Sequence, residues 1–530
     1  MRKRLVAAAL SATLSLEAQD LDPATLLQPR PDSWPTYNGD YSGKRFSSLR
    51  QINKSNVEML TVAWAFQLDL PSGPGLKSTP LLVNGTLYFT APDDVWAVDA
   101  RSGRQIWHYR YHANDGLHIG QRGVGMYKDR LYFETPDAHL LCLDAKSGEV
   151  QWDVELADVK LGYWAATAPL IVRNHVIAGV AGDFNDLHGK LDSFDPETGK
   201  RQWQWSALPK PAEPGSETWP KNSDAIEHGG GMAWLTGTYD PDLNLLYWGT
   251  GNPNPVLSGA TRPGDNLFTC SIVALNPDTG KLVWHFQPSP HDVHDWDAVQ
   301  TPVLVDADFQ GKRRKLLLQA SRNGYFFVLD RTNGKALLSV PYEEINWSSG
   351  VDAIGRPIAK LEKYPSSAGT LVEPDALGAT NWMSPSFNPE TGLLYVNSHR
   401  SFSLYYNLSS GKPEGFAGRD LSVWARSALK AIDYRTGKIR WEHDLGLGGD
   451  WAGVLSTAGG LAFTADNHGN ILGLDAANGH TLWHAYGGSV VQTAPITYEL
   501  DGRQYILVGS NRVLYAWALP ESLAKKASTR

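Results

Sequence analysis

The chain has 530 residues, of which 42% are hydrophobic and 20% charged, and its formal net charge is −8 at pH 7. This length exceeds what one ordinary core supports, so we expect several domains or a fold that grows by repeating units. The acidic balance disfavours nucleic acid as a partner, and no segment approaches the roughly 20 apolar residues of a membrane span. The 20 Trp and 51 Gly residues favour short strands, tight turns and aromatic packing over helices.

The N-terminus predicts a secretory signal peptide. Basic residues 2–4 precede the apolar stretch 5–16, and small residues follow near Ala18, which is the layout of an export signal. An amphipathic helix is the alternative. We expect residues 1–18 to be removed and residues 19–530 to form a single domain in the periplasm.

An eleven-residue pattern recurs along the chain, with an Asp or Asn, a Gly and a closing Trp. The copies are AVDARSGRQIW ending at Trp107, CLDAKSGEVQW at Trp152, SFDPETGKRQW at Trp203, ALNPDTGKLVW at Trp284, AIDYRTGKIRW at Trp441 and GLDAANGHTLW at Trp483. A seventh copy, VLDRTNGKALL, ends at Leu338 without a Trp. The pattern predicts a strand, a turn in which Gly takes a positive φ, and a second strand whose Trp docks between neighbouring sheets.

The spacing of the copies predicts the architecture. Adjacent copies lie 42 to 51 residues apart where the spacing is clean, which is the length of one four-stranded propeller blade. Two wider gaps contain the related turns TYDPDLNLLYWGTGNP and SFNPETGLLYVN, so we expect them to hold further blades. An early strand (62–69) is expected to close the ring against residues 505–519. The prediction is an all-β fold, an eight-bladed β-propeller, in which segments 340–385 and 400–428 are loops that cover a site on one face.

Several longer motifs carry a resemblance to a known family. They are WPTYNGDYSGKRFSSLRQINKSNVEMLTVAWAF (34–66), YWGTGNPNP (247–255), RPGDNLFTCSIVALNPDTGKLVW (262–284), PHDVHDWDAVQTPVL (290–304), SRNGYFFVLDRTNGK (321–335) and GGDWAGVLSTAGGLAFTAD around Trp451. On these motifs the chain resembles the quinoprotein alcohol dehydrogenases of the methanol and ethanol dehydrogenase type over roughly residues 33–518. The resemblance implies an enzyme that oxidises an alcohol with pyrroloquinoline quinone (PQQ) and a calcium or lanthanide ion.

The same resemblance implies the catalytic and metal-binding residues. Asp295, in PHDVHDWD, matches the catalytic base and a ligand of the metal ion. Arg322, in SRNG, matches the cation near the reacting carbonyl of the cofactor. Asn252, in GTGNPNP, matches an amide ligand of the metal. Asp297 would lie on the same side as Asp295 in an extended segment and would add an oxygen ligand, as in the lanthanide-using members; a solvated Asp is the alternative.

One further metal ligand departs from the family pattern. Family members carry a Glu in a G-A-E-F-like stretch, where this chain reads AGDFNDLHG. Asp183 replaces that Glu if Phe184 aligns with the family aromatic residue. A register shifted by one residue places Phe184 there instead.

The resemblance also implies cofactor-binding residues. Arg122, in IGQRGVGMY, matches an Arg that binds a cofactor carboxylate, for which a guanidinium fork is well shaped. Trp234 corresponds to the Trp on which the planar cofactor stacks, and Trp451 and Arg322 belong to the same cofactor-binding set. Lys77 occupies a place where the family often has an acidic or amide residue, and it is a candidate contact for a cofactor carboxylate.

Cysteine usage is a second departure. Many family members carry adjacent cysteines that form a strained ring over the cofactor, but the corresponding stretch here (116–123) has none, so His118 or Ile119 is expected to cover that face. Cys142 and Cys270 either pair or stay free. The chain has no C-x-x-C-H motif and hence no attached c-type haem, so electrons are expected to pass to a separate periplasmic c-type cytochrome.

Three alternatives stay open from the sequence. The first is oxidation of a sugar or polyol, and the second is a non-catalytic propeller scaffold in envelope assembly. The third is a hydrolase-like zinc site built from His291, Asp292, His294 and Asp295. Four aromatic residues suggest a lid over the site, namely Trp382, Phe402, Tyr405 and Trp451.

Overall fold

The recurring turn has the conformation that its sequence predicts. In the computed structural model, which describes residues 21–70, 73–113, 115–182, 185–408, 415–449 and 451–523, the Asp99 carboxylate accepts hydrogen bonds from the backbone N–H groups of Arg101 and Ser102. Gly103 follows with a φ of +71°, a conformation that costs Gly nothing because it has no Cβ. The first side chain of the turn is an acceptor in the other copies too, at Asp144, Asp195, Asn276, Asp330, Asp433 and Asp475.

Five of the six closing Trp residues contact the turn of the next copy, in agreement with the predicted docking between sheets; they are Trp107, Trp152, Trp203, Trp284 and Trp441. The indole Nε1 of Trp107 donates a hydrogen bond of 3.0 Å to the carbonyl oxygen of Ala145, and the Tyr88 hydroxyl donates to the same oxygen at 3.2 Å. The same indole-to-carbonyl bond joins Trp64 to Ala100, Trp152 to Pro196, Trp203 to Pro277, Trp284 to Arg331 and Trp441 to Ala476.

The strands of the N-terminal half form antiparallel sheets of four consecutive strands. These are β3 (Leu81–Val83), β4 (Thr86–Ala91), β5 (Asp94–Asp99) and β6 (Gln105–Arg110); β7 (Gly125–Tyr127), β8 (Arg130–Glu134), β9 (His139–Asp144) and β10 (Val150–Glu155); β11 (Leu170–Val172), β12 (His175–Gly179), β13 (Lys190–Phe194) and β14 (Arg201–Ser206); and β15 (Thr238–Asp240), β16 (Leu245–Gly249), β17 (Ile272–Leu275) and β18 (Leu282–Phe286). Inner strands are mostly apolar and buried, and all six residues of β4 are buried, because neighbouring sheets cover both faces.

The C-terminal half continues this pattern with longer strands. Its sheets are β19 (Val303–Phe309), β20 (Lys312–Ala320), β21 (Tyr325–Asp330) and β22 (Lys335–Pro341); β25 (Thr370–Val372), β26 (Ser386–Asn388), β27 (Leu393–Asn407), β28 (Gly418–Asp433) and β29 (Ile439–Leu447); and β30 (Leu455–Thr457), β31 (Leu461–Ala465), β32 (Asn470–Asp475) and β33 (Thr481–Tyr486), to which β1 (Phe46–Ser47) adds in parallel. A separate hairpin pairs β23 (Ser348–Val351) with β24 (Pro357–Ala359).

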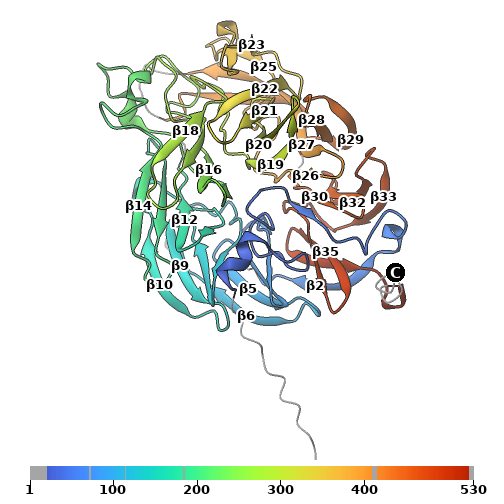
Figure 1. Cartoon of the computed structure of the whole chain (residues 1–530). Helices are drawn as coiled ribbons and strands as arrows, with labels where there is room; N and C mark the ends of the chain where they lie inside the picture. The colour runs from blue at the N-terminus through green and yellow to red at the C-terminus, as the bar shows by residue number, and fades with distance from the viewer. Residues whose placement is uncertain are drawn as a thin grey trace, which may run out of the picture.

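The last sheet joins the two ends of the chain. β2 (Thr61–Gln67) pairs with β36 (Val513–Ala518), which continues through β35 (Arg503–Ser510) to β34 (Ile496–Leu500), so the predicted pairing of an early strand with the C-terminal segment is confirmed. In Figure 1 the sheets follow one another around a common centre, and β2 and β35 belong to the same sheet, with β36 between them. This radial order is typical of β-propellers.

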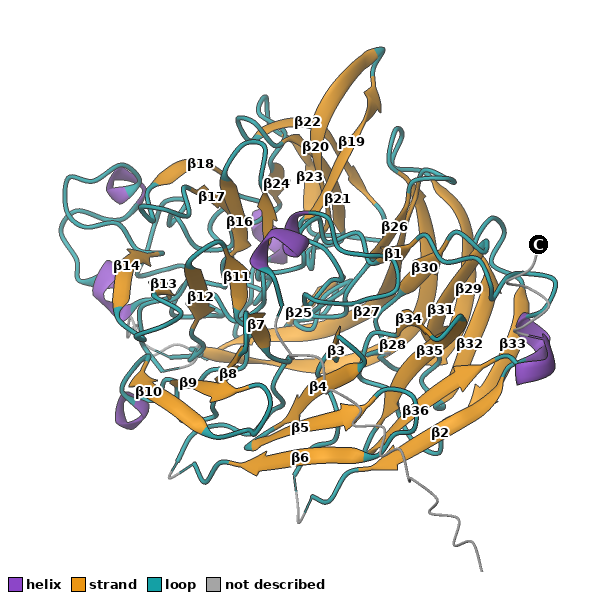
Figure 2. Cartoon of the chain, turned by 60° about the horizontal axis from the view of Figure 1, so that its bottom comes forward, coloured by secondary structure: helices purple, strands orange, loops and turns teal. Residues whose placement is uncertain are grey.

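Helical structure is limited to short turns within the described residues. Figure 2 shows strands in every part of the molecule and brief helical segments between them. These are the 3-10 helices η1 (Pro23–Leu27), η2 (Val57–Met59), η3 (Val159–Leu161), η4 (Ser216–Thr218), η5 (Ala225–His228) and η6 (Leu361–Lys363). The signal peptide predicted for residues 1–18 lies outside the described residues.

Two expectations about the wide gaps are wrong. The residues between Trp203 and Trp284 form the sheet that Trp284 itself ends, not an additional blade. The turn TYDPDLN connects β15 and β16, the first two strands of that sheet. The turn did not indicate a new blade, because an Asp-capped turn can connect any two adjacent antiparallel strands. Likewise, the gap before Trp441 holds the β23–β24 hairpin and one sheet in its described part. Residues 400–428 are mostly the long β27–β28 hairpin and not a covering loop.

The Trp contact gives a stability prediction at Gly334. Gly334 has a φ of +76°, and a Cβ added there would lie 2.5 Å from Cε3 of Trp284. Gly334→Ala therefore combines backbone strain of about 1–2 kcal/mol with overpacking of about 1–3 kcal/mol. We expect a lower unfolding midpoint in urea.

Gly311→Ala is the matched control for that prediction. Gly311 has a φ of +73°, but its added Cβ would meet nothing within 4 Å, so this variant carries the backbone strain alone. We expect a smaller loss of stability than in Gly334→Ala. Equal shifts in the two midpoints would show that the Trp contact contributes nothing.

Candidate active site

Asp292 holds the segment that carries Asp295. Its Oδ2 accepts hydrogen bonds from the backbone N–H groups of residues 294–296, at 3.4, 3.0 and 3.2 Å. Asp295 has a φ of +68°, so these bonds stabilise a backbone conformation that fixes the direction of its side chain. Burial raises the pKa of Asp292 to about 6. From the sequence Asp292 was only a candidate zinc ligand, because no local pattern indicates this positioning role.

Arg322 bridges two carboxylates. Its Nη2 lies 3.0 Å from Oδ2 of Asp295, and its Nη1 lies 2.8 Å from Oδ2 of Asp297. The two Asp side chains therefore lie on the same side, as the sequence predicts. The side chain of Asp295 is 14% exposed and that of Asp297 is 2% exposed. Asp295 is thus the carboxylate of this pair that a small molecule can reach.

Asp297 connects two further parts of the site. Its Oδ2 also accepts a hydrogen bond from Nε1 of Trp234 at 2.9 Å, and its Oδ1 accepts one from the backbone N–H of Asn252 at 2.7 Å. Burial raises the pKa of Asp297, and the charge of Arg322 opposes this shift. The structure therefore brings Asn252, Asp295, Asp297, Arg322 and Trp234 together.

Asn252 offers an oxygen to this cluster. The residue is fully buried, and its Oδ1 has no hydrogen-bond partner within the described part of the chain. A buried acceptor without a partner is costly unless an ion, water or ligand satisfies it. Carboxylate and amide oxygens are the ligands that hard cations such as calcium prefer, so this donor set fits a cation.

Arg122 and Lys77 form a cationic pair beside Trp382. The Arg122 guanidinium carbon lies 5.2 Å from the ring centroid of Trp382 and 6.0 Å from that of Trp234, and Lys77 Nζ lies 5.2 Å from the Trp382 centroid. Neither cation forms an ion pair with a described carboxylate. Burial, with a smaller effect of Arg122, lowers the pKa of Lys77 to about 8. A buried guanidinium and a half-buried ammonium, next to aromatic rings and without an ion-pair partner among the described carboxylates, fit an anionic planar ligand.

The four aromatic residues predicted to form a lid lie in different environments. Trp382 and Trp451 stack with ring centroids 4.5 Å apart and an interplanar angle of 7°, so both belong to the site. Phe402 stacks instead on Trp424. Tyr405 is fully buried, and its inclusion in the lid is wrong, because its hydroxyl donates to a backbone carbonyl inside the core.

The remaining predicted residues are not part of the cluster described above. Asp183 and Phe184 lie outside the described residues. His118 hydrogen-bonds to Asp93 at 2.9 Å, and Ile119 packs against a hydrophobic cluster that includes site residue Trp234. Both cysteines are buried and free.

The zinc alternative is wrong. His291 and His294 hydrogen-bond to the backbone carbonyl groups of Gly264 and Lys363, which separates their ring nitrogens from the Asp292 carboxylate. Among the described residues, no group of three or more His, Cys, Asp or Glu side chains is arranged to hold a metal ion. Within the described part of the chain, the amide oxygen of Asn252 is therefore the candidate that adds to the carboxylates of Asp295 and Asp297.

Taken together, the fold and the site define a β-propeller protein that holds an anionic planar ligand next to a cation. The model of the PQQ family, described as glucose/ethanol/alcohol dehydrogenase, β-propeller domain, matches residues 34–353 and 422–506. The chain belongs to this family.

Relatives match over most of the chain. A quinoprotein alcohol dehydrogenase of Pseudomonas putida, PedH, is 36% identical over 96% of this chain and 90% of its own length. The crystal structure of the quinohemoprotein alcohol dehydrogenase of Comamonas testosteroni has a TM-score of 0.88 at 32% identity, over 94% of this chain and 83% of that one. A europium-containing methanol dehydrogenase has a TM-score of 0.84 at 28% identity, over 93% of this chain and 99% of that one.

The Lys77 pKa gives a prediction for cofactor binding. With a pKa of about 8, Lys77 is charged at pH 7 and largely neutral at pH 9. We expect the affinity of the apoprotein for PQQ, measured by quenching of Trp fluorescence, to fall over this range. Lys77→Met should bind PQQ about tenfold more weakly at pH 7 and should lose most of this pH dependence.

Lys315→Met serves as the control, because Lys315 pairs with Asp242 at the surface and its loss removes an equal charge. Its affinity and pH dependence should match those of the wild type. An unchanged pH profile in Lys77→Met would contradict a contact between Lys77 and the cofactor.

Proposed function

We propose that this chain is a PQQ-dependent alcohol dehydrogenase that oxidises an alcohol to an aldehyde or ketone. The observation that carries the proposal is the bonding of Asp295 and Asp297 to one guanidinium, Arg322, beside the unpartnered oxygen of Asn252. Membership of the PQQ family and the names of the relatives support it.

The residues present fit the cofactor and its cation. Arg122, Lys77 and Arg322 would hold an anionic quinone, with Trp234 and Trp451 as aromatic neighbours. Asn252, Asp295 and Asp297 would supply oxygen ligands to a calcium or lanthanide ion, and we include Asp183 as a further ligand by its resemblance to the family pattern. When bound, the quinone supplies the acceptor for the two electrons of the alcohol.

The chain itself supplies the base and its orientation. Asp295 accepts the proton of the alcohol hydroxyl on a carboxylate oxygen, a role that is worth about a hundredfold to ten-thousandfold in rate. Asp292 fixes the backbone of Asp295, and Arg322 fixes its carboxylate at 3.0 Å. The positive charge of Arg322 also stabilises negative charge that develops during the reaction.

The remaining proposals concern the context of the site. We assign the sheets of four or five strands to an eight-bladed propeller formed by residues 19–530, preceded by a signal peptide at residues 1–18 that directs the protein to the periplasm. The similarity to the Comamonas testosteroni structure supports the propeller. No helix among the described residues has the length and apolar character needed to cross a membrane. We propose a periplasmic c-type cytochrome as the electron acceptor, because the chain carries no haem-attachment motif.

Replacement of the base tests the proposed function. Apoprotein reconstituted with PQQ and a metal ion should oxidise primary alcohols in a dye-linked assay, and activity should require both additions. Asp295→Asn keeps the shape of the side chain but removes the base, so we expect kcat to fall by about a hundredfold or more. Full turnover in an Asp295→Asn variant that still binds the quinone would refute the assigned role.

Asp297 gives a separate prediction for the choice of metal. A trivalent lanthanide gains more than a divalent calcium from an additional carboxylate ligand. We therefore expect Asp297→Ala to lower activation by a light lanthanide by about tenfold or more relative to activation by calcium. The measurement is a titration of the apoprotein with each ion at saturating PQQ. An equal loss with both ions would show that Asp297 acts through Arg322 and Trp234 and not as a ligand.

A further inference from the structure

Arg262 is a fully buried arginine in the connection between β16 and β17, the same connection that carries Asn252. Within the described part of the chain, no carboxylate lies within ion-pair distance of its guanidinium. A buried charge without a counter-ion is costly unless hydrogen bonds satisfy it. The partners of these hydrogen bonds therefore indicate the role of Arg262.

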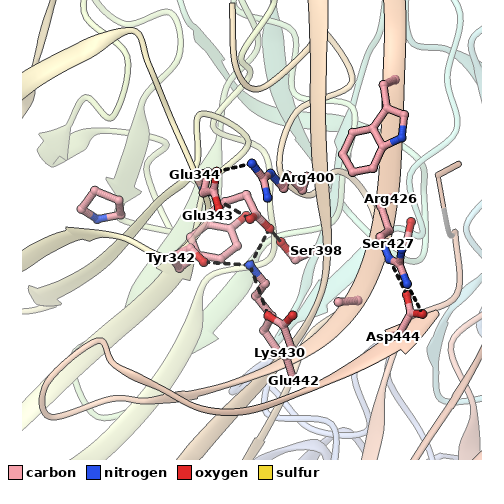
Figure 3. A pocket seen from close by; sticks show the side chains of 13 residues that line it. Tyr342, Glu343, Glu344, Ser398, Arg400, Arg426, Ser427, Lys430, Glu442 and Asp444 are labelled. Atoms are coloured by element: carbon pink, nitrogen blue, oxygen red, sulfur yellow. Dashed lines mark hydrogen bonds and ion pairs between the residues drawn. The ribbon is translucent and has the colours of Figure 1, made fainter. Parts of the chain in front are cut away.

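A charged cavity elsewhere in the molecule shows the alternative arrangement. Its volume is about 510 Å³, and it lies beside β28. Figure 3 shows its charged groups turned toward one another: Lys430 Nζ lies 2.7 Å from Oε2 of Glu343, and Arg426 pairs with Asp444. In each pair a carboxylate compensates the cation. Arg262 instead donates to uncharged oxygens, which belong to the backbone and to one amide side chain.

The Arg262 guanidinium bonds two chain segments at once. Its Nη2 donates to the carbonyl oxygen of Pro255 at 2.9 Å and to that of Asp292 at 2.6 Å, and its Nε also donates to Pro255, at 3.3 Å. Pro255 lies three residues after Asn252. Asp292 lies three residues before Asp295. Arg262 is thus bound to two segments that supply proposed oxygen ligands of the cation.

The direction of the Arg262 side chain is itself fixed. Its Nη1 donates to Oδ1 of Asn266 at 2.9 Å, and Nδ2 of Asn266 donates to the carbonyl oxygen of Arg262 at 3.0 Å. Burial lowers the pKa of Arg262 to about 10, and the charge of Asp292 opposes this shift. The guanidinium is therefore charged at neutral pH and held in one orientation.

Asp292 connects Arg262 to the base. Its carbonyl oxygen accepts the bond from Arg262, while Oδ2 of its carboxylate accepts from the backbone N–H groups of residues 294–296. The turn that directs the Asp295 side chain is therefore anchored at its first residue by Arg262.

The segment that carries Asn252 is anchored on both sides of this residue. The backbone N–H of Gly231 donates to the carbonyl oxygen of Asn252 at 2.9 Å, and Arg262 holds the carbonyl group of Pro255. Asn252 and Asp295 lie on different segments, and Arg262 bonds to both of these segments. It therefore controls the separation between the Asn252 amide oxygen and the Asp295 carboxylate.

We propose that Arg262 is a positioning residue of the cation site, which sets the separation of the Asn252 and Asp295 oxygens by bonding both segments to one guanidinium. This inference rests on the proposed function, because it concerns the cation of that site. Groups that orient the ligands of a metal ion commonly contribute about ten- to a hundredfold to its affinity. A guanidinium suits this role because its donors point in fixed directions, whereas a Lys ammonium is a point charge on a flexible stem.

Terbium(III) binding tests the inference. Terbium is a hard cation that oxygen ligands bind, and its emission is sensitised by a nearby indole such as that of Trp234, which bonds to Asp297. The full-length protein, freed of metal, is titrated with terbium. In Arg262→Met we expect the Kd for terbium to rise by about a hundredfold. Arg262→Lys keeps the charge but loses the planar fork, so its Kd should rise by about tenfold; this variant decides the question if Arg262→Met folds poorly.

The affinity for PQQ separates a positioning role from a general loss of structure. Arg122 and Lys77 lie on segments to which Arg262 does not bond. Without added metal, we therefore expect both Arg262 variants to bind PQQ with a Kd within about twofold of the wild-type value, measured by quenching of Trp fluorescence.

Arg45→Lys is the matched control. Arg45 is also fully buried, and it donates to the carbonyl oxygens of Tyr37 at 2.7 Å and Pro495 at 2.9 Å, which lie outside the cation site. Its replacement should lower the unfolding midpoint in urea, as that of Arg262 does, but should leave the Kd for terbium within about twofold of the wild-type value.

The outcomes separate this inference from the proposed function. An unchanged Kd for terbium in both Arg262 variants, in a protein whose wild type binds the ion, overturns the positioning role alone. Equal losses of terbium affinity and PQQ affinity, or an equal loss of terbium affinity in Arg45→Lys, also overturn it. A wild type that binds no terbium, or an Asp295→Asn variant that binds it as well as the wild type, overturns the proposed cation site itself.

Discussion

The hydrogen bond from a Trp indole to the turn of the next sheet is the interaction on which this fold depends. Sheets stacked side by side share apolar surface, but such surface does not fix how one sheet sits on its neighbour. The carbonyl oxygen of Ala145 accepts from Trp107 and also from Tyr88, both in the preceding sheet. Because the bond is directional and partly shielded from water, it sets the position of each sheet relative to the next.

The site exploits this fixed arrangement. Its side chains come from three different sheets or connections: Arg122 lies between β6 and β7, which belong to neighbouring sheets, Asn252 follows β16, and Arg322 lies between β20 and β21 of another sheet. Loops normally carry binding groups on a rigid scaffold, and here the Trp contacts provide the rigidity. The convergence of such distant segments on Asp295 and Asp297 lets one guanidinium hold two carboxylates in a defined orientation.

The sequence predicted what depends on local chemistry. The capped turns and their Gly residues are written in every eleven-residue copy, and the docking Trp is written in six of the seven. The motifs that resemble the family named Asn252, Asp295, Asp297 and Arg322, and the structure brings these residues together. The count of sheets within the wide gaps failed, because an Asp-capped turn looks the same in a first hairpin as in a last one. The role of Asp292, the cation contacts of Trp382 and the burial of Tyr405 depend on which segments meet in space. No local sequence pattern encodes which distant segments lie together in the folded chain.

The pairing of β2 with β36 has a consequence for how the molecule is made. Thr61 of β2 and Ala518 of β36 face each other although 457 positions of the chain separate them. During synthesis, β2 therefore cannot pair until β36 has been made. Until then β2 has no partner from its own sheet, and an unpaired strand edge is a template for unwanted association. Closing so long a loop also makes this step late and slow. A nascent chain of this kind stays open until translation is nearly complete, which is the state in which a polypeptide can still be threaded across a membrane or captured by a chaperone.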